Sequence, residues 1–143
     1  MPALVPQLAQ IRLLSGLSRP ILDDLVSRGS TRRCPPGRDL VTEGAADAGM
    51  QLVLEGSAVV VVAGKEVRSL EQGDYFGEMS LIDGGSRSAT VRAGEQGCTT
   101  FAISPLSFWE LVGVHPEMAR ALLVVLAARI LELEARNPSS AVD

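Results

Sequence analysis

Gly77, Glu78 and Arg87 stand in a glycine-rich segment whose residue types suit an anionic ligand. A helical turn that starts near Glu78 would present backbone N–H groups without intrahelical partners, and such groups bind anions. The guanidinium of Arg87 offers a planar fork of donors that matches two phosphate oxygens. The Glu78 carboxylate can accept a hydrogen bond from a sugar hydroxyl. Gly77 has no Cβ, so a ligand can approach the backbone closely. These residue types predict a site for a small anion that carries a sugar.

The whole segment resembles the phosphate-binding cassette of the cyclic nucleotide-binding domain family. It reads GDYFGEMSLI at residues 73–82 and RSATVRA at residues 87–93. The family pattern combines Phe-Gly-Glu, a small apolar or Ser-containing turn, and Arg-Ser/Thr-Ala-Thr-Val. Residues 36–44 and 50–62 look like the family's early strand-and-turn segment and its central hairpin. The resemblance covers roughly residues 8–136 and is specific, because several fixed residues occur at two linked spacings.

The resemblance implies a role for each cassette residue. Glu78 would accept from the ribose 2′-hydroxyl, helped by the Gly77 backbone, and Arg87 would pair with the cyclic phosphate. Ser88 and the backbone N–H of Ala89 would complete the phosphate contacts. The other implied ligand-binding residues are Met79 and Ser80 in the cassette turn, Val60 and Val67 in the purine pocket, and Arg129 on the last helix.

Two positions depart from the family pattern. Ser86 stands where many relatives have Pro before the arginine, which loosens the loop but need not stop binding. Leu133 stands where the bacterial cAMP-activated transcription factors have a hydroxyl residue that reads the adenine. The last helix also has no aromatic ring that could stack on the purine, so we expect modest affinity. Ser88 does not distinguish cAMP from cGMP; we favour cAMP and keep cGMP as the alternative.

The elements that must position these residues fall into three zones. Residues 4–30 are expected to be helical, because Leu and Ile recur at three- and four-residue spacings. Residues 31–103 contain short strand-like runs between glycine-containing breaks, among them Glu55-Gly56 and Gly94. Residues 104–136 are expected to be helical again and 137–143 to form a disordered tail. The pattern predicts an α+β fold, in which N-terminal helices and a long C-terminal helix flank an antiparallel jelly-roll or β-roll barrel, as one domain over residues 1–143.

The last predicted helix has more apolar residues than one buried face needs. One set is Met118, Leu122, Val125, Leu126, Ile130 and Leu133, and a second is Leu123, Val124, Ala127 and Leu131. Such a helix requires burial on more than one side. One side suits the barrel and the other a second copy of the chain, which makes a homodimer through this helix one expected partner. Phe108 and Trp109 are expected to be packing residues.

The composition excludes several classes of protein. The chain has 143 residues, of which 46% are hydrophobic and 21% charged, which indicates one globular domain. A net charge of -4 argues against direct nucleic-acid binding. The longest apolar stretch, residues 121–128, is too short to span a membrane, and the N-terminus has no secretory signal. We therefore expect no membrane contact and a cytoplasmic location, with a weak compositional hint of a bacterial source.

The reactive side chains do not suggest catalysis. Cys34 and Cys98 are expected to be reduced, small apolar residues. His115 is the only histidine, and the sequence has neither a metal-type cluster nor a nucleophile motif. We expect no enzyme activity, no metal and no cofactor. The favoured reading is a sensor that couples cAMP binding to movement of its last helix and passes the signal to an unidentified effector protein. The alternatives are a dimerisation or docking scaffold that binds no ligand, and a fragment of a larger cyclic-nucleotide-regulated protein.

Overall fold

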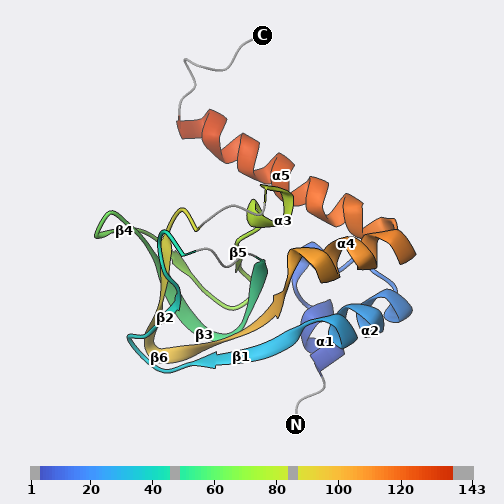
Figure 1. Cartoon of the computed structure of the whole chain (residues 1–143), viewed down its shortest axis with the longest axis horizontal. Coiled ribbons are helices and arrows are strands. Elements are labelled where there is room, and N and C mark those ends of the chain that lie inside the picture. Colours follow the sequence, from blue (N-terminus) through green and yellow to red (C-terminus); the bar gives the residue numbers. More distant parts are fainter. Residues whose placement is uncertain (1–3, 46–48, 84–86, 137–143) are drawn as a thin grey trace.

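The computed structural model describes residues 4–45, 49–83 and 87–136 (Figure 1). The chain begins with three helical segments, α1 (Leu4–Ala9), the 3-10 helix η1 (Arg12–Leu14) and α2 (Arg19–Arg28). The strands are β1 (Ser30–Cys34), β2 (Asp39–Val41), β3 (Met50–Val62), β4 (Lys65–Leu70), β5 (Tyr75–Phe76) and β6 (Thr90–Ile103). The short helix α3 (Ser80–Asp83) lies between β5 and β6, and α4 (Pro105–Val114) and α5 (Glu117–Arg136) complete the described chain.

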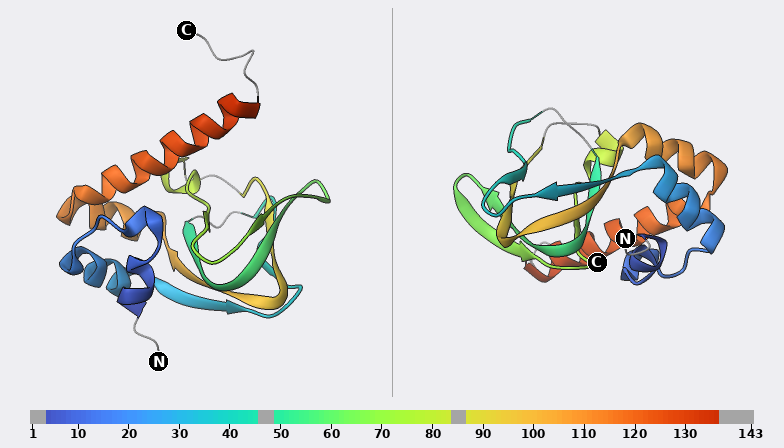
Figure 2. Two further views of the ribbon diagram at one scale, coloured as in Figure 1. Left: turned by 180° about the vertical axis from the view of Figure 1, so that it is seen from behind. Right: turned by 90° about the horizontal axis from the view of Figure 1, so that it is seen from below.

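All strands belong to one antiparallel sheet with the order β1-β6-β3-β4, to which β2 is joined through β6 and β5 through β3. The long strands β3 and β6 each change partner along their length, so the sheet curls into a roll (Figure 2). Helices α1, α2 and α4 gather at one end of this roll, and α5 starts there and extends past α3 (Figures 1 and 2). The predicted α+β β-roll with flanking helices is confirmed.

Two expected strand breaks are wrong. Glu55-Gly56 and Gly94 interrupt neither β3 nor β6, each of which runs through as one strand. The pairing shifts register instead, between Val53 and Glu55 and again between Gly56 and Ala58. Gly56 has a φ of +82°, and a Cβ there would collide with the backbone of β6. Here glycine permits a bulge and a sharp bend within a strand, which sequence alone does not distinguish from a turn.

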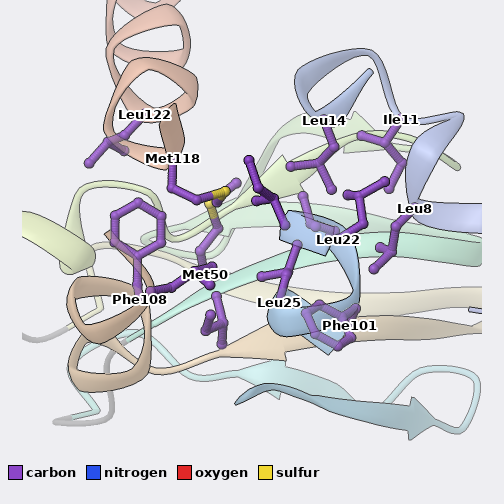
Figure 3. Packing of buried hydrophobic residues seen from close by; sticks show 14 of the residues in the cluster. Leu8, Ile11, Leu14, Leu22, Leu25, Met50, Phe101, Phe108, Met118 and Leu122 are labelled. Atoms are coloured by element: carbon purple, nitrogen blue, oxygen red, sulfur yellow. The ribbon is translucent and has the colours of Figure 1, made fainter. Parts of the chain in front are cut away.

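The core has two parts. The larger cluster joins the helices to one end of the sheet and includes Leu25, Met50, Phe101 and Phe108 (Figure 3). The smaller cluster fills the roll and includes Val41, Val60, Phe76 and Val91. Helix α4 starts where Ser104 caps it, because the Ser104 hydroxyl accepts from the backbone N–H of Ser107 at 3.1 Å.

Helix α5 divides into a packed half and an exposed half. Met118 and Leu122 belong to the larger cluster and Val125 is also buried, whereas residues 127–136 are exposed throughout. The structure describes the helix up to Arg136, and the predicted tail at 137–143 lies outside the described residues. Among the described helices, none is long and apolar enough to cross a membrane.

Candidate functional site

Gly77 occupies a position that only glycine fits. It directly follows β5 and has a φ of +85°, in the left-handed region. A Cβ at this position would lie within 3.0 Å of both the Gly49 carbonyl oxygen and Nη1 of Arg87. Glycine is therefore required twice, for the backbone conformation and for the close approach of a buried carbonyl and a guanidinium.

Ser80 fastens the turn after Gly77 to the start of β3. Its hydroxyl has one proton to donate, and both the Gly77 carbonyl at 2.7 Å and the Gly49 carbonyl at 3.1 Å lie within reach. The same oxygen accepts from the Gly49 backbone N–H at 2.8 Å. Because Ser80 is buried, these bonds satisfy backbone groups that water does not reach. The turn is thereby fixed by the protein itself.

Arg87 is held from its backbone and from its side chain. Its N–H donates to the Ala45 carbonyl and its carbonyl accepts from the Gly44 N–H, both at 2.9 Å. Its Nη1 donates to the Gly49 carbonyl, also at 2.9 Å, and the residue is only 7% exposed. A guanidinium placed beside the cassette turn presents a planar fork of donors, which matches the oxygens of a bound phosphate.

Glu78 connects the cassette to the last helix. The residue is 4% exposed, and its Oε1 lies 3.6 Å from Nη1 of Arg129 on α5. The side chain of Arg129 remains 45% exposed, so this ion pair lies at the boundary between the interior and solvent. It joins the exposed half of α5 to the cassette.

One cavity of about 810 Å³ brings the predicted ligand-binding residues together. It is lined by all ten, which are Val60, Val67, Gly77, Glu78, Met79, Ser80, Arg87, Ser88, Ala89 and Arg129. Their exposure differs, since Val60, Glu78, Ser80 and Arg87 are buried, whereas Val67 and Met79 are about half exposed. The cavity thus has a fixed floor and an open rim.

The lining of this cavity is strongly positive. Among the described residues, four arginines, at positions 68, 87, 129 and 136, line it together with one carboxylate, that of Glu78. Val41, Val60 and Val91 line the same cavity from strands that pair with one another, and they give it an apolar wall. A positive part beside an apolar wall suits a ligand with a phosphate at one end and a flat, weakly polar group at the other.

Sequence reasoning missed six lining residues: Val41, Val62, Arg68, Phe76, Val91 and Arg136. Arg136 could have been found, because it follows Arg129 by seven residues and so lies on the same helix face. Val41 and Val91 could not, because only the register that places them opposite each other brings them to the cavity. Leu133 is not among the described lining residues, and Ser86 lies outside the described part.

A model of the cyclic nucleotide-binding domain matches residues 31–115, which is more than half of the chain and includes the whole cassette. The chain belongs to the cyclic nucleotide-binding domain family. Family membership explains why Gly77, Glu78 and Arg87 converge on one cavity. The domains of this family are typically regulatory rather than catalytic, and no cluster of potential metal ligands occurs among residues 4–45, 49–83 and 87–136.

Known proteins similar to this domain include ion channels, kinases and transcription factors. The potassium/sodium hyperpolarization-activated cyclic nucleotide-gated channel 1 of rabbit (Oryctolagus cuniculus) is 32% identical over 102 residues, which cover 71% of this chain but 12% of the channel. The catabolite activator protein of Thermus thermophilus is 29% identical with a TM-score of 0.78, covering 87% of this chain and 60% of that one. The regulatory domain of Toxoplasma gondii PKA, crystallised with cAMP, is 26% identical with a TM-score of 0.73, covering 90% of this chain and 48% of that one. The chain thus spans about an eighth of the length of its curated channel relatives.

Proposed function

We propose that this chain is a single, non-catalytic sensor domain for cAMP that acts in the cytoplasm. The observation that carries the proposal is the convergence of the buried residues Arg87 and Glu78 on one cavity whose other charged residues are arginines. An anionic sugar phosphate offers oxygens that match the planar donor fork of Arg87, and it supplies a hydroxyl donor for Glu78. The cAMP in the crystal structure of the similar Toxoplasma gondii domain supports this choice of ligand.

The ligand would lie with its phosphate toward Arg87. The exposed hydroxyl of Ser88 and the Ala89 backbone N–H would complete the phosphate contacts. Glu78 would accept from the ribose 2′-hydroxyl, while the base would rest against Val60 and Val67. The valine side chains offer apolar contact area but no hydrogen-bonding group that could distinguish adenine from guanine, so they support binding of either cAMP or cGMP.

The signal would pass through the exposed half of α5. Residues 127–136 bury no side chain of their own, and Arg129 joins them to the cassette through Glu78. A ligand that engages Glu78 and the arginines of α5 would favour the position of the helix in which these contacts form. The shift is limited by the difference in ligand affinity between the two positions of the helix.

The outer face of α5 suits a protein partner. Leu123, Val124, Ile130 and Leu131 are each more than half exposed. Because Leu123 and Ile130 are seven residues apart, as are Val124 and Leu131, the four form one apolar stripe away from the buried face. A second copy of the chain or an effector protein would cover this stripe, and its movement would be the output. The same stripe would serve the scaffold alternative.

Calorimetric titration with cAMP and with cGMP tests the proposal. We expect saturable binding of cAMP by the wild type, and about 10- to 100-fold weaker binding by Arg87→Lys, which keeps the charge and loses the planar fork. Arg33→Lys is the matched control, because Arg33 is exposed on β1 and does not line the cavity. Tighter binding of cGMP than of cAMP would mean that the domain is a sensor for cGMP. The absence of both heat and thermal stabilisation with either nucleotide would reject the sensor and favour the scaffold.

A further inference from the structure

The two cysteines of the chain face each other across neighbouring strands. Cys34, the last residue of β1, is the direct partner of Cys98 in the antiparallel pairing of β1 with β6. Side chains at opposed positions lie on the same face of a sheet, and their Cα atoms are about 4.5–5.5 Å apart. Disulfides bridge Cα separations of about 4.4–6.8 Å. We propose that Cys34 and Cys98 are an oxidation site that forms a reversible disulfide within the chain.

The pair is now reduced and shielded. Both residues have free thiols, and Cys34 is 9% exposed while Cys98 is 2% exposed. Burial raises the pKa of Cys98 to about 11, and the nearby Cys34 raises it further in the same direction. Burial likewise raises the pKa of Cys34. Because the thiolate is the reactive form, the raised pKa values make both thiols slow to oxidise in the closed structure at neutral pH.

Cys34 is the thiol that becomes accessible first. It ends β1, the edge strand, which pairs only with β6 among the described strands. Edge-strand ends open locally at lower cost than central strands. Its Sγ donates a weak hydrogen bond to the Arg38 carbonyl at 3.3 Å, which opening would break. Cys98, by contrast, lies between two paired strands, opposite Gly56 of β3.

The cysteine pair lies where the roll turns its corner. Strand β6 pairs with β2 at Arg92 and with β1 at Cys98, so it exchanges partners between these two residues. Gly97 has a φ of +79°, and a Cβ there would lie 2.9 Å from the Cys34 carbonyl oxygen. The strands therefore approach closely beside the pair. A disulfide would fix this corner and close a loop over residues 35–97, which contains the whole cassette.

The chemistry requires a two-electron oxidant, for which a peroxide is sufficient. The Cys34 thiolate attacks one peroxide oxygen, the O–O bond breaks, and a sulfenic acid and water form once the leaving hydroxide takes up the proton released from Cys34. The Cys98 sulfur then attacks the sulfenic sulfur, the S–S bond forms, and the S–O bond breaks. The Cys98 proton leaves with the departing hydroxide as a second water. Two thiols and one hydrogen peroxide thus give one disulfide and two waters.

Oxidation of the folded chain by hydrogen peroxide tests this inference. A denatured sample sets the reaction time: the folded protein is treated with peroxide for as long as the denatured protein needs to form the disulfide. The folded sample is then unfolded and alkylated with iodoacetamide. We expect the folded wild type to lose the mass of two hydrogens and to take up no alkyl group, with both effects reversed by dithiothreitol. Cys34→Ala and Cys98→Ala each retain one thiol and should not form the monomeric disulfide. The oxidised wild type should melt about 5–10 °C higher than the reduced protein.

Three results would overturn the inference. They are two alkylatable thiols in the folded sample when the denatured sample is fully oxidised, a stable sulfinic acid on either cysteine, or a disulfide that joins two chains. Neither cysteine lines the ligand cavity, so the result does not depend on the proposed sensor function. The same oxidised sample should still bind cAMP if the sensor proposal is correct. A failure of binding in both redox forms concerns the sensor alone.

Discussion

The substitution Gly77→Ala should damage the site more than a comparable glycine substitution elsewhere. Gly77 combines a φ of +85° with a backbone carbonyl and a guanidinium in the space that a Cβ would occupy. Gly64, in the hairpin between β3 and β4, has a φ of +80° with open space around it. The two positions therefore share the conformational cost of alanine and differ in the collision.

The expected magnitudes follow from these two terms. Placing alanine in the left-handed region costs about 1–2 kcal/mol, and this is the whole cost at Gly64. Forcing a methyl group into a packed site adds about 1–3 kcal/mol at Gly77, because the Gly49 carbonyl belongs to the backbone and yields little. At about 2–4 °C for each kcal/mol, Gly64→Ala should lower the Tm by about 2–8 °C and Gly77→Ala by about 4–20 °C.

Urea unfolding and cAMP calorimetry on both variants provide the assay. The Gly77→Ala variant should unfold at a lower urea concentration than Gly64→Ala. It should also bind cAMP at least about 10-fold more weakly, because the new methyl group displaces the Arg87 guanidinium. Gly64→Ala should bind cAMP like the wild type. Equal stability of the two variants, or full affinity in Gly77→Ala, would refute the argument that close packing around Gly77 shapes the site.

Three further predictions test the surroundings of the cassette. The substitution Ser80→Ala should cost about 1–3 kcal/mol in urea unfolding, because the buried backbone N–H of Gly49 loses its acceptor; no loss would mean that water replaces the hydroxyl. A hydrogen bond from Arg28 holds the pKa of Asp24 below its usual 3.8, so the wild type should be more stable than Asp24→Asn above that pH. In an acid titration of both proteins, the difference in stability should vanish as the pH falls through the lowered pKa. A difference that persists at the acidic end would contradict this assignment. The single tryptophan, Trp109, donates to the Leu81 carbonyl of α3 at 2.7 Å, so its fluorescence should change on cAMP binding and the signal should disappear in Trp109→Phe without loss of affinity. An unchanged emission at saturating cAMP would show that the charge of the bound nucleotide does not alter the surroundings of the indole beside α3.

The sequence predicted the site where its residues are close along the chain. Gly77, Glu78 and Ser80 lie within a single turn, and their types alone define the chemistry of that turn. Arg87 follows Glu78 by nine residues, so the motif could also predict that these two side chains belong to one site. The helices at both ends were equally readable, because helix capping and three- to four-residue spacing are local properties.

The parts that sequence could not predict depend on register between distant strands. Gly56 looked like a turn, yet it forms a bulge inside β3, because the neighbouring strand continues past it. Val41 and Val91 reach the cavity only because they pair across β2 and β6. The opposition of Cys34 and Cys98 has the same origin, and no local pattern records it. A shift of one residue would turn each of these side chains to the other face of the sheet.

The division of α5 determines where a ligand signal can arise. The cassette is fixed by bonds of the chain itself, since Ser80 and Arg87 both bond to Gly49. Contacts between a ligand and this fixed part would be similar in every position of α5, so they would supply affinity without moving the helix. Only groups that approach or leave the ligand with α5 can bias its position, and among the described cavity residues these are Arg129 and Arg136. Replacing either should therefore reduce the response of the helix more than the affinity, whereas changes at Arg87 should do the reverse.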